Sequence, residues 1–167
     1  HISQAALDST TILVTSTAGM IAFGAACWGA RKDLMRNKLP SLLSMTALVF
    51  LVQMVHISTG LGFSSHLLGG LLMAVLFGPS LAMLSMGFVL AAQVAFLGAG
   101  TWSTLGANFL TMGVLAVYSG YLVYHLLEGS RSAGLNLIQF FVFTASVLAS
   151  ISVSAAFASL LIGNGFG

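Results

Sequence analysis

Long apolar stretches separated by short polar links are the feature that most limits how this chain can fold. They lie at about residues 10–30, 40–58, 66–77, 80–98, 106–127 and 135–162. A helix that crosses a bilayer needs about 20 mainly apolar residues, and every stretch except the third is close to that length. The third would cross only if the chain around Gly78 and Pro79 extended it, or if protein shielded it. The sequence therefore predicts an all-α, polytopic membrane bundle of about six transmembrane helices.

Composition points to lipid as the solvent of this chain. Only 5% of its residues are charged and 58% are hydrophobic, with a mean hydropathy of +1.05. A soluble domain needs a charged surface, which this composition does not supply. So few charges also exclude a nucleic-acid-binding surface. We expect residues 1–167 to form a single transmembrane domain in contact with the bilayer.

The basic residues predict an orientation. All five lie in two links, the first before the second span and the other before the sixth: Arg31, Lys32, Arg36, Lys38 and Arg131. With six spans these two links fall on the same side, which the positive-inside rule makes cytoplasmic. The N-terminus is then predicted to lie outside.

Three of the four histidines fall on that outer side, namely His1, His56 and His66. The α-amine and imidazole of an N-terminal His can chelate one metal ion together. If a Met preceded it, the amine, the His amide and the imidazole could bind in one plane, and His66 could complete a square-planar set of four nitrogens. Such a set suits Ni(II) or Cu(II) and can take Co(II). The alternatives are a disordered end for His1, a helix-start residue for His66 and an interfacial residue for His56. His125, near the cytoplasmic end of the fifth span, is interpreted as a headgroup-level residue.

Polar residues inside the predicted spans have two interpretations. Gln53, Gln93 and Asn108 lie towards the outer halves of their helices. They could orient the histidines as supporting hydrogen-bond partners, or they could join helices to one another. The second role is favoured for Gln93. Asp8 stands where an N-cap of the first span is expected.

Small residues recur along the first span. Alanine occupies every fourth position, at Ala18, Ala22, Ala26 and Ala30. This spacing makes a smooth helix face that another helix can approach closely. The face could dock a separate membrane subunit, or it could pack within this chain.

Motifs for covalent or nucleotide chemistry are missing from the sequence. It holds no GxxxxGK[ST] pattern, no paired acids in a polar setting and no Ser/His/Asp arrangement. The chain is therefore predicted not to be an enzyme, and no organic cofactor is evident. Two rivals to a metal-capture function stay open: a structural subunit of another membrane complex, and a copper enzyme that uses the N-terminal His.

Several ordered motifs resemble the CbiM/NikM family, the substrate-binding membrane component of nickel and cobalt energy-coupling-factor transporters. They are QMV at 53–55, SHLLGG at 65–70, GP at 78–79, QVAFLG at 93–98, LGAN at 105–108 and MG at 112–113. The opening His1-Ile2 is similar to the family's Met-His-Ile start without its Met.

The resemblance implies a function and a set of partners. It implies capture of Ni(II) or Co(II) as transported substrate on the outer side, with His1 and His66 as ligands. Position and residue type, rather than the resemblance, make His56 a further candidate ligand and Gln53 and Asn108 candidate supporting residues; the family has a small polar residue or Asn more usually at the place of His56. It also implies that the N-terminal segment folds inward as part of the site. The implied partners are a transmembrane coupling subunit and cytoplasmic ATPases that hydrolyse ATP, in the inner membrane of a prokaryote. The alanine face is favoured as the docking surface.

Overall fold

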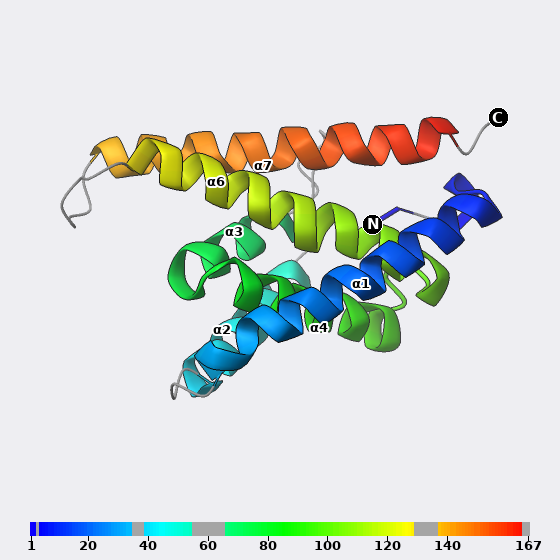
Figure 1. Cartoon of the computed structure of the whole chain (residues 1–167), viewed down its shortest axis with the longest axis horizontal. Coiled ribbons are helices and arrows are strands. Elements are labelled where there is room, and N and C mark those ends of the chain that lie inside the picture. The colour runs from blue at the N-terminus through cyan, green and yellow to red at the C-terminus, as the bar shows by residue number, and fades with distance from the viewer. Residues whose placement is uncertain (3, 35–38, 55–65, 129–136, 165–167) are drawn as a thin grey trace.

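The computed structural model shows a bundle of helices (Figure 1). It describes residues 1–2, 4–34, 39–54, 66–128 and 137–164. No strand occurs in these ranges, which confirms the predicted all-α class. In chain order the elements are η1 (Gln4–Ala6), α1 (Ser9–Asp33), α2 (Leu39–Met54), α3 (His66–Phe77), α4 (Pro79–Leu97), η3 (Trp102–Thr104), α5 (Leu105–Asn108), η4 (Phe109–Leu115), α6 (Ala116–Glu128) and α7 (Leu137–Asn164).

Each predicted apolar stretch contains a helix, but the helices differ in length. Four helical segments of the described chain are long and apolar enough to cross a bilayer, at Ser9–Asp33, Pro79–Leu97, Trp102–Leu127 and Leu137–Gly163. α2 is shorter, with 16 described residues. α3 has only 12 residues, which is about 18 Å at 1.5 Å per residue and too short to cross alone. Protein covers one side of it, where Leu71, Met73 and Ala74 are fully buried, while Leu72 and Leu76 are exposed.

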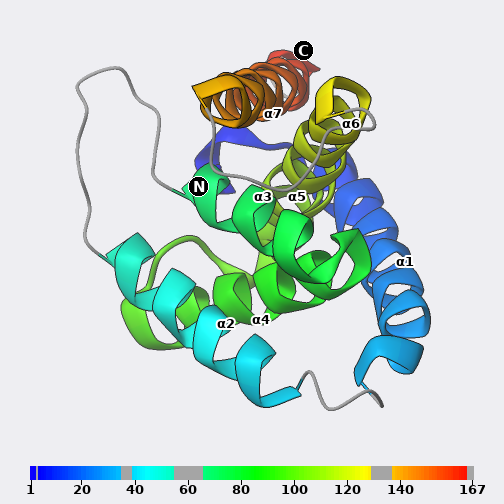
Figure 2. The same ribbon diagram turned by 90° about the vertical axis from the view of Figure 1, so that its left-hand side faces the viewer.

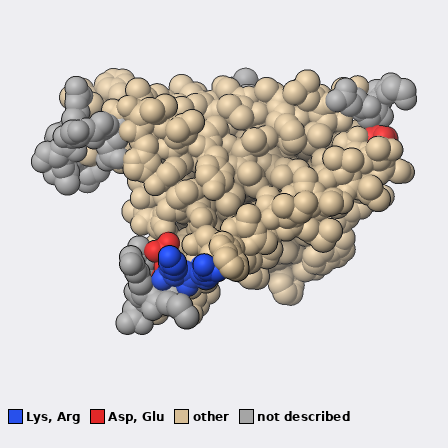
Figure 3. All heavy atoms as spheres, in the orientation of Figure 1, with Lys and Arg blue, Asp and Glu red and all other residues tan. Residues whose placement is uncertain are grey.

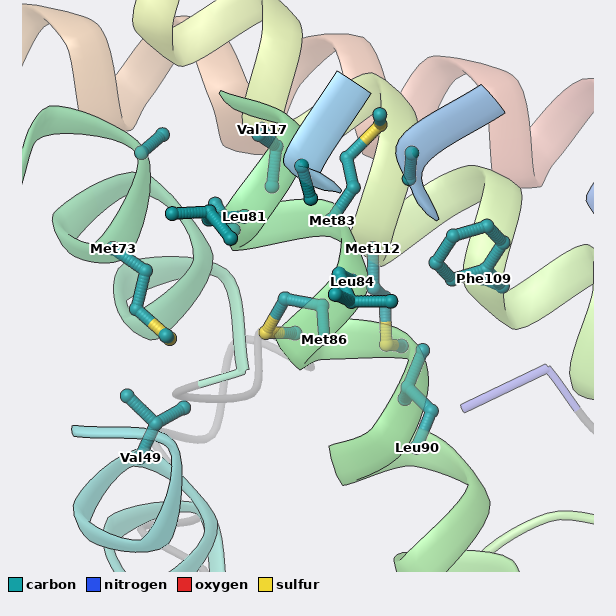
Figure 4. Close-up of a cluster of buried hydrophobic side chains, with 14 of the residues drawn as sticks. Val49, Met73, Leu81, Met83, Leu84, Met86, Leu90, Phe109, Met112 and Val117 are labelled. Carbon is teal, nitrogen blue, oxygen red and sulfur yellow. The ribbon is translucent and has the colours of Figure 1, made fainter. Parts of the chain in front are cut away.

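α4 forms the centre of the bundle. Ten of its 19 residues are buried, more than on any other described helix, and α1, α2 and α3 all pack against it (Figure 2). Its side chains join those of the neighbouring helices in one apolar cluster, where Met73, Met86 and Met112 lie among leucines (Figure 4). Unbranched thioether side chains adapt to the gaps between helices that cross at different angles.

The outer surface of the bundle is apolar, as a lipid-facing surface must be. Leu13, Met20 and Trp28 on α1 and Leu137 on α7 are each exposed by more than two thirds. Figure 3 shows this surface as almost free of charge, with the Lys and Arg of the described residues at one end of the molecule. Arg31 is at that end, and its guanidinium lies 3.5 Å from the ring centre of Trp28.

Helix starts follow the expected signals. Asp8 caps α1, because its carboxylate accepts a hydrogen bond from the Thr11 amide at 3.1 Å. This confirms the predicted capping role. Pro79 occupies the first turn of α4, where a missing N–H costs nothing, and Gly78 before it has a φ of +93° that favours glycine. The turn lets α4 fold back beside α3.

The alanine face of α1 packs mainly within this chain. Ala26 and Ala30 are fully buried in the central cluster, and Ala22 packs against it. Ala18 is half-buried. Other helices of the same chain cover Ala26 and Ala30, which is the internal packing given above as the alternative to partner docking. The small side chains serve the close approach of α1 to α4.

Candidate functional site

The first two residues fold back onto the bundle and pair with Asn108, the last residue of α5. The Ile2 amide donates to Asn108 Oδ1 at 2.7 Å, and Asn108 Nδ2 donates to the Ile2 carbonyl at 3.4 Å. Asn108 is 1% exposed and Ile2 is 7% exposed. We call this pair of hydrogen bonds the N-terminal clasp. A side-chain amide offers one donor and one acceptor side by side, so it pairs with a backbone unit as a neighbouring strand would.

Local structure before α5 holds the amide of Asn108 in place. Its Nδ2 also donates to Thr104 Oγ1 at 3.4 Å. Thr104 is fully buried, and it forms a reciprocal capping box with Thr101 at the start of η3. The capping box satisfies amides at the helix start and fixes the turn that leads into α5.

An apolar anchor keeps the N-terminal segment against the bundle. Ile2, Leu7 and Ala107 form a second buried cluster, which lies apart from the central one. The residues packed against it come from η1, α1 and the end of α7: Ala6, Ile12, Ala158, Leu161 and Ile162. Burial of two large aliphatic side chains stabilises the docked segment by roughly 3–5 kcal/mol. The segment therefore reaches the clasp from an anchored position.

The imidazole of His1 lies beside Gly100. A Cβ added at Gly100 would be 3.7 Å from His1 Nδ1 and 3.5 Å from Asn108 Nδ2. Gly100 has a φ of +89°, which other residues adopt only with strain. A glycine at this position lets the loop after α4 run close to the N-terminal residue.

The α-amino group of His1 is perturbed by its surroundings. Burial lowers its pKa from the usual value of 8.0, because desolvation penalises the charged ammonium form. Metal ligands must be deprotonated, so a lowered pKa leaves more of the amine in the form that can bind a cation near neutral pH.

A second polar group lies between α2, α3 and α4. Gln93 Nε2 donates to Gln53 Oε1 at 2.8 Å, and both side chains are buried. Gln53 Nε2 also lies 3.3 Å from the position that a Cβ of Gly69 would occupy, so the pair sits against the first turn of α3. Gln93 Oε1 is buried without a hydrogen-bond partner among the described residues. The pair joins helices, as expected for Gln93.

The structure brings some of the predicted site residues together and leaves others out. The clasp holds Ile2, the residue next to His1, against Asn108, and Gln53 reaches the turn of α3 that His66 begins. For His66 the structure describes the backbone position only, and His56 lies outside the described residues. In the described ranges no three side chains of His, Cys, Asp or Glu gather around one point. The predicted ligand set includes backbone nitrogen at the N-terminal residue, which is not a side-chain group. The predicted nitrogen ligands are therefore untested by this finding.

Sequence reasoning missed Gly100, Thr104 and the π-helix η4. A glycine on each side of Ala99 was the available signal for a loop that needs positive φ. Nothing in the local sequence marks Thr104, whose partner Asn108 is one helical turn away, as a support for that side chain.

His125 stacks edge-to-face on Tyr121 with ring centres 4.4 Å apart, and both lie on α6.

Comparison with known proteins identifies the family. The family model described as the CbiM cobalt uptake substrate-specific transmembrane region matches residues 1–165. The chain belongs to this family. The family's description agrees with the apolar helices and with the fold.

Curated relatives of this CbiM-family chain have names from metal transport. A putative metal transport protein from Methanocaldococcus jannaschii is 39% identical over 98 residues, which are 58% of this chain and 44% of that protein. A putative fused nickel transport protein from Archaeoglobus fulgidus is 32% identical over 76% of this chain and 41% of its own length. The chain thus spans about half the length of the first curated relatives it matches.

A solved structure shares the fold. The crystal structure of a transition metal transporter superposes with a TM-score of 0.83 at 23% identity, covering 98% of this chain and 70% of the other. A truncated transition metal transporter superposes with a TM-score of 0.79 at 24% identity. These likenesses show that the arrangement of helices is a known one.

Proposed function

We propose that this chain captures Ni(II) or Co(II) as the substrate-binding subunit of a divalent metal importer. The observation that carries the proposal is the N-terminal clasp, which holds the residue bearing an amine and an imidazole in a fixed place. Membership in the cobalt uptake family and the names of curated cobalt and nickel transport proteins support the choice of ion.

The ligands are nitrogen atoms. His1 supplies its imidazole and its backbone nitrogen, which is an amine where the protein begins at His1 and an amide where a Met precedes it. His66, at the first position of α3, supplies a further imidazole, and His56 is a candidate for another. Nitrogen donors of this kind bind Ni(II) more tightly than Co(II) in the general order of divalent affinities.

Two buried amide side chains support the ligands. Asn108 holds the backbone next to His1, and Gln53 lies against the turn that follows His66. Groups that orient ligands matter for affinity, since losing one typically weakens metal binding by about 10- to 100-fold. Both residues are therefore assigned as supporting residues of the site.

The chain works in a bilayer and with partners. The first helix and the two basic links predict that the site faces outward from the inner membrane of a prokaryote, with Arg31 and Lys32 on the cytoplasmic side. Inward release needs an energy source, which a transmembrane coupling subunit and cytoplasmic ATPases would supply. The exposed half of α1, beside the half-buried Ala18, is the surface on this helix that a partner could reach.

Isothermal titration of the purified chain with Ni(II) and Co(II) tests the proposal. About one ion per chain should bind to the wild type, and binding should be lost in His66→Ala, because an imidazole ligand is removed. His125→Ala is the matched control, since that exposed histidine pairs with Tyr121 on α6 and should leave binding unchanged. Unchanged affinity in a folded His66→Ala variant would contradict the assignment of His66 as a metal ligand. If neither ion binds to the wild type, the metal-capture function itself fails.

A further inference from the structure

The helix that carries Asn108 does not continue as a regular α-helix. Residues Phe109–Leu115 form the π-helix η4, in which hydrogen bonds reach one residue further, as from the Ala116 amide to the Thr111 carbonyl. The extra residue in each turn rotates the chain before η4 relative to α6. Asn108 is the residue immediately before this segment. π-helical turns are rare and occur frequently at functional sites.

A serine on α7 supports the π-helical backbone from outside. Ser154 Oγ donates to the Thr111 carbonyl at 3.0 Å, and its side chain is buried. One turn earlier, Ser150 Oγ donates to the Ala116 carbonyl at 2.7 Å, just beyond η4. The two serines are equally inaccessible to lipid and water, but only Ser154 bonds to a carbonyl inside the π-helix.

The same face of α7 reaches the N-terminal segment. Ala158, one turn after Ser154, packs against the cluster of Ile2, Leu7 and Ala107. α7 therefore contacts both sides of the N-terminal clasp: the helix that presents Asn108 and the segment that Asn108 holds. Figure 1 shows α6 beside the first part of α7, from which it then diverges.

We propose that Ser154 is a positioning residue for the metal site. Its hydroxyl fixes the π-helical backbone at Thr111, and this sets the rotation at which Asn108 meets Ile2. The expected effect on metal affinity rests on the proposed function. The expected effect on the hydrogen bonds between Ile2 and Asn108 does not require a metal ion.

The experiment compares Ser154→Ala with Ser150→Ala in the full chain. Each variant removes one buried hydrogen bond from α7 to a backbone carbonyl, so the thermal midpoints should fall by similar amounts. Ni(II) affinity is measured by titration. The solvent exchange of the Ile2 amide is measured by NMR on isoleucine-labelled, metal-free protein, with the signal assigned through Ile2→Val.

We expect Ser154→Ala to weaken Ni(II) binding about ten-fold and to accelerate exchange of the Ile2 amide, while Ser150→Ala leaves both unchanged. Equal effects of the two variants, or no effect of either, would overturn the proposal. If Ser154→Ala does not fold, Ser154→Cys keeps the volume with a weaker donor and is held to the same two measurements. If the wild type binds no Ni(II), the proposed function is refuted. If Ser154→Ala alone still accelerates exchange of the Ile2 amide, the role of Ser154 in positioning the N-terminal clasp is supported all the same.

Discussion

Replacing Asn108 by leucine tests whether the N-terminal clasp determines metal binding. Leucine keeps the branched outline of asparagine but removes all three hydrogen bonds of the side chain. These are the 2.7 Å bond from the Ile2 amide, the 3.4 Å bond to the Ile2 carbonyl and the 3.4 Å bond to Thr104. The site is buried, so water does not readily replace them.

The magnitude follows from these contacts. The short bond contributes about 1 kcal/mol, and the two long ones contribute less. The Ile2 amide is then left buried without its partner, which costs about 1–3 kcal/mol. Together these losses make the free energy of docking the N-terminal segment less favourable by about 2–4 kcal/mol. A change of 1.4 kcal/mol is a factor of about ten in an equilibrium constant. Even the lower value shifts the docking equilibrium about 30-fold.

Titration with Ni(II), together with a thermal unfolding curve, separates the local effect from a global one. The dissociation constant for Asn108→Leu should rise about ten-fold, because Asn108 orients the backbone next to His1 and losing a group that orients a ligand weakens metal binding by about 10- to 100-fold. Ser85→Ala is the control, since it removes a part-buried hydrogen bond of 3.0 Å from Thr46, between α2 and α4. That variant should lower the thermal midpoint without changing Ni(II) affinity. An unchanged dissociation constant in folded Asn108→Leu would refute the reasoning.

Three further predictions concern packing, a buried amide and pH. Gly106→Ala should destabilise the fold by about 1–3 kcal/mol in thermal unfolding, because its Cβ would lie 2.5 Å from the backbone of α1. Gly24→Ala, with nothing within 4 Å of its Cβ, should not, and equal midpoints would contradict this account. Gln93→Leu should cost about 1–3 kcal/mol by removing the buried donor to Gln53, and an unchanged midpoint would argue against that bond. In a protein that begins at His1, the lowered pKa of the His1 amine means that the undocked segment binds more protons. Docking and Ni(II) affinity should therefore weaken as the pH falls below about 8, and a flat titration series between pH 8 and 6 would exclude the amine as a ligand.

Much of the fold could be predicted from hydrophobic patterning. The six apolar stretches each hold a helix, and the signals at Asp8 and Pro79 mark helix starts correctly. These features are local, since a cap or a proline acts within one turn of its own position. The length of α3 was visible too, but only the structure shows that its residues are buried by the surrounding helices.

The site could be predicted only in part. Residue type singled out Asn108 and Gln53, because polar side chains in a span need partners. The partners themselves could not be predicted: Asn108 holds a backbone 106 positions earlier in the chain, and Gln53 pairs with a residue 40 positions later. The alanine face of α1 was visible as a pattern, but the pattern did not say what packs against it. Small residues at helical spacing fit a partner subunit and an internal neighbour equally well.

The sequence by itself determined that this protein is a helical membrane bundle, where its helices start and which residue types could bind a metal ion. Those properties depend on composition and on contacts within a few residues. The tertiary structure alone decided that Ile2 pairs with Asn108, that Gly100 lies beside His1 and that Ser154 supports a π-helix. Such pairings depend on how distant helices approach one another, and a hydrogen bond needs its two atoms within about 3 Å, a condition that no local pattern encodes.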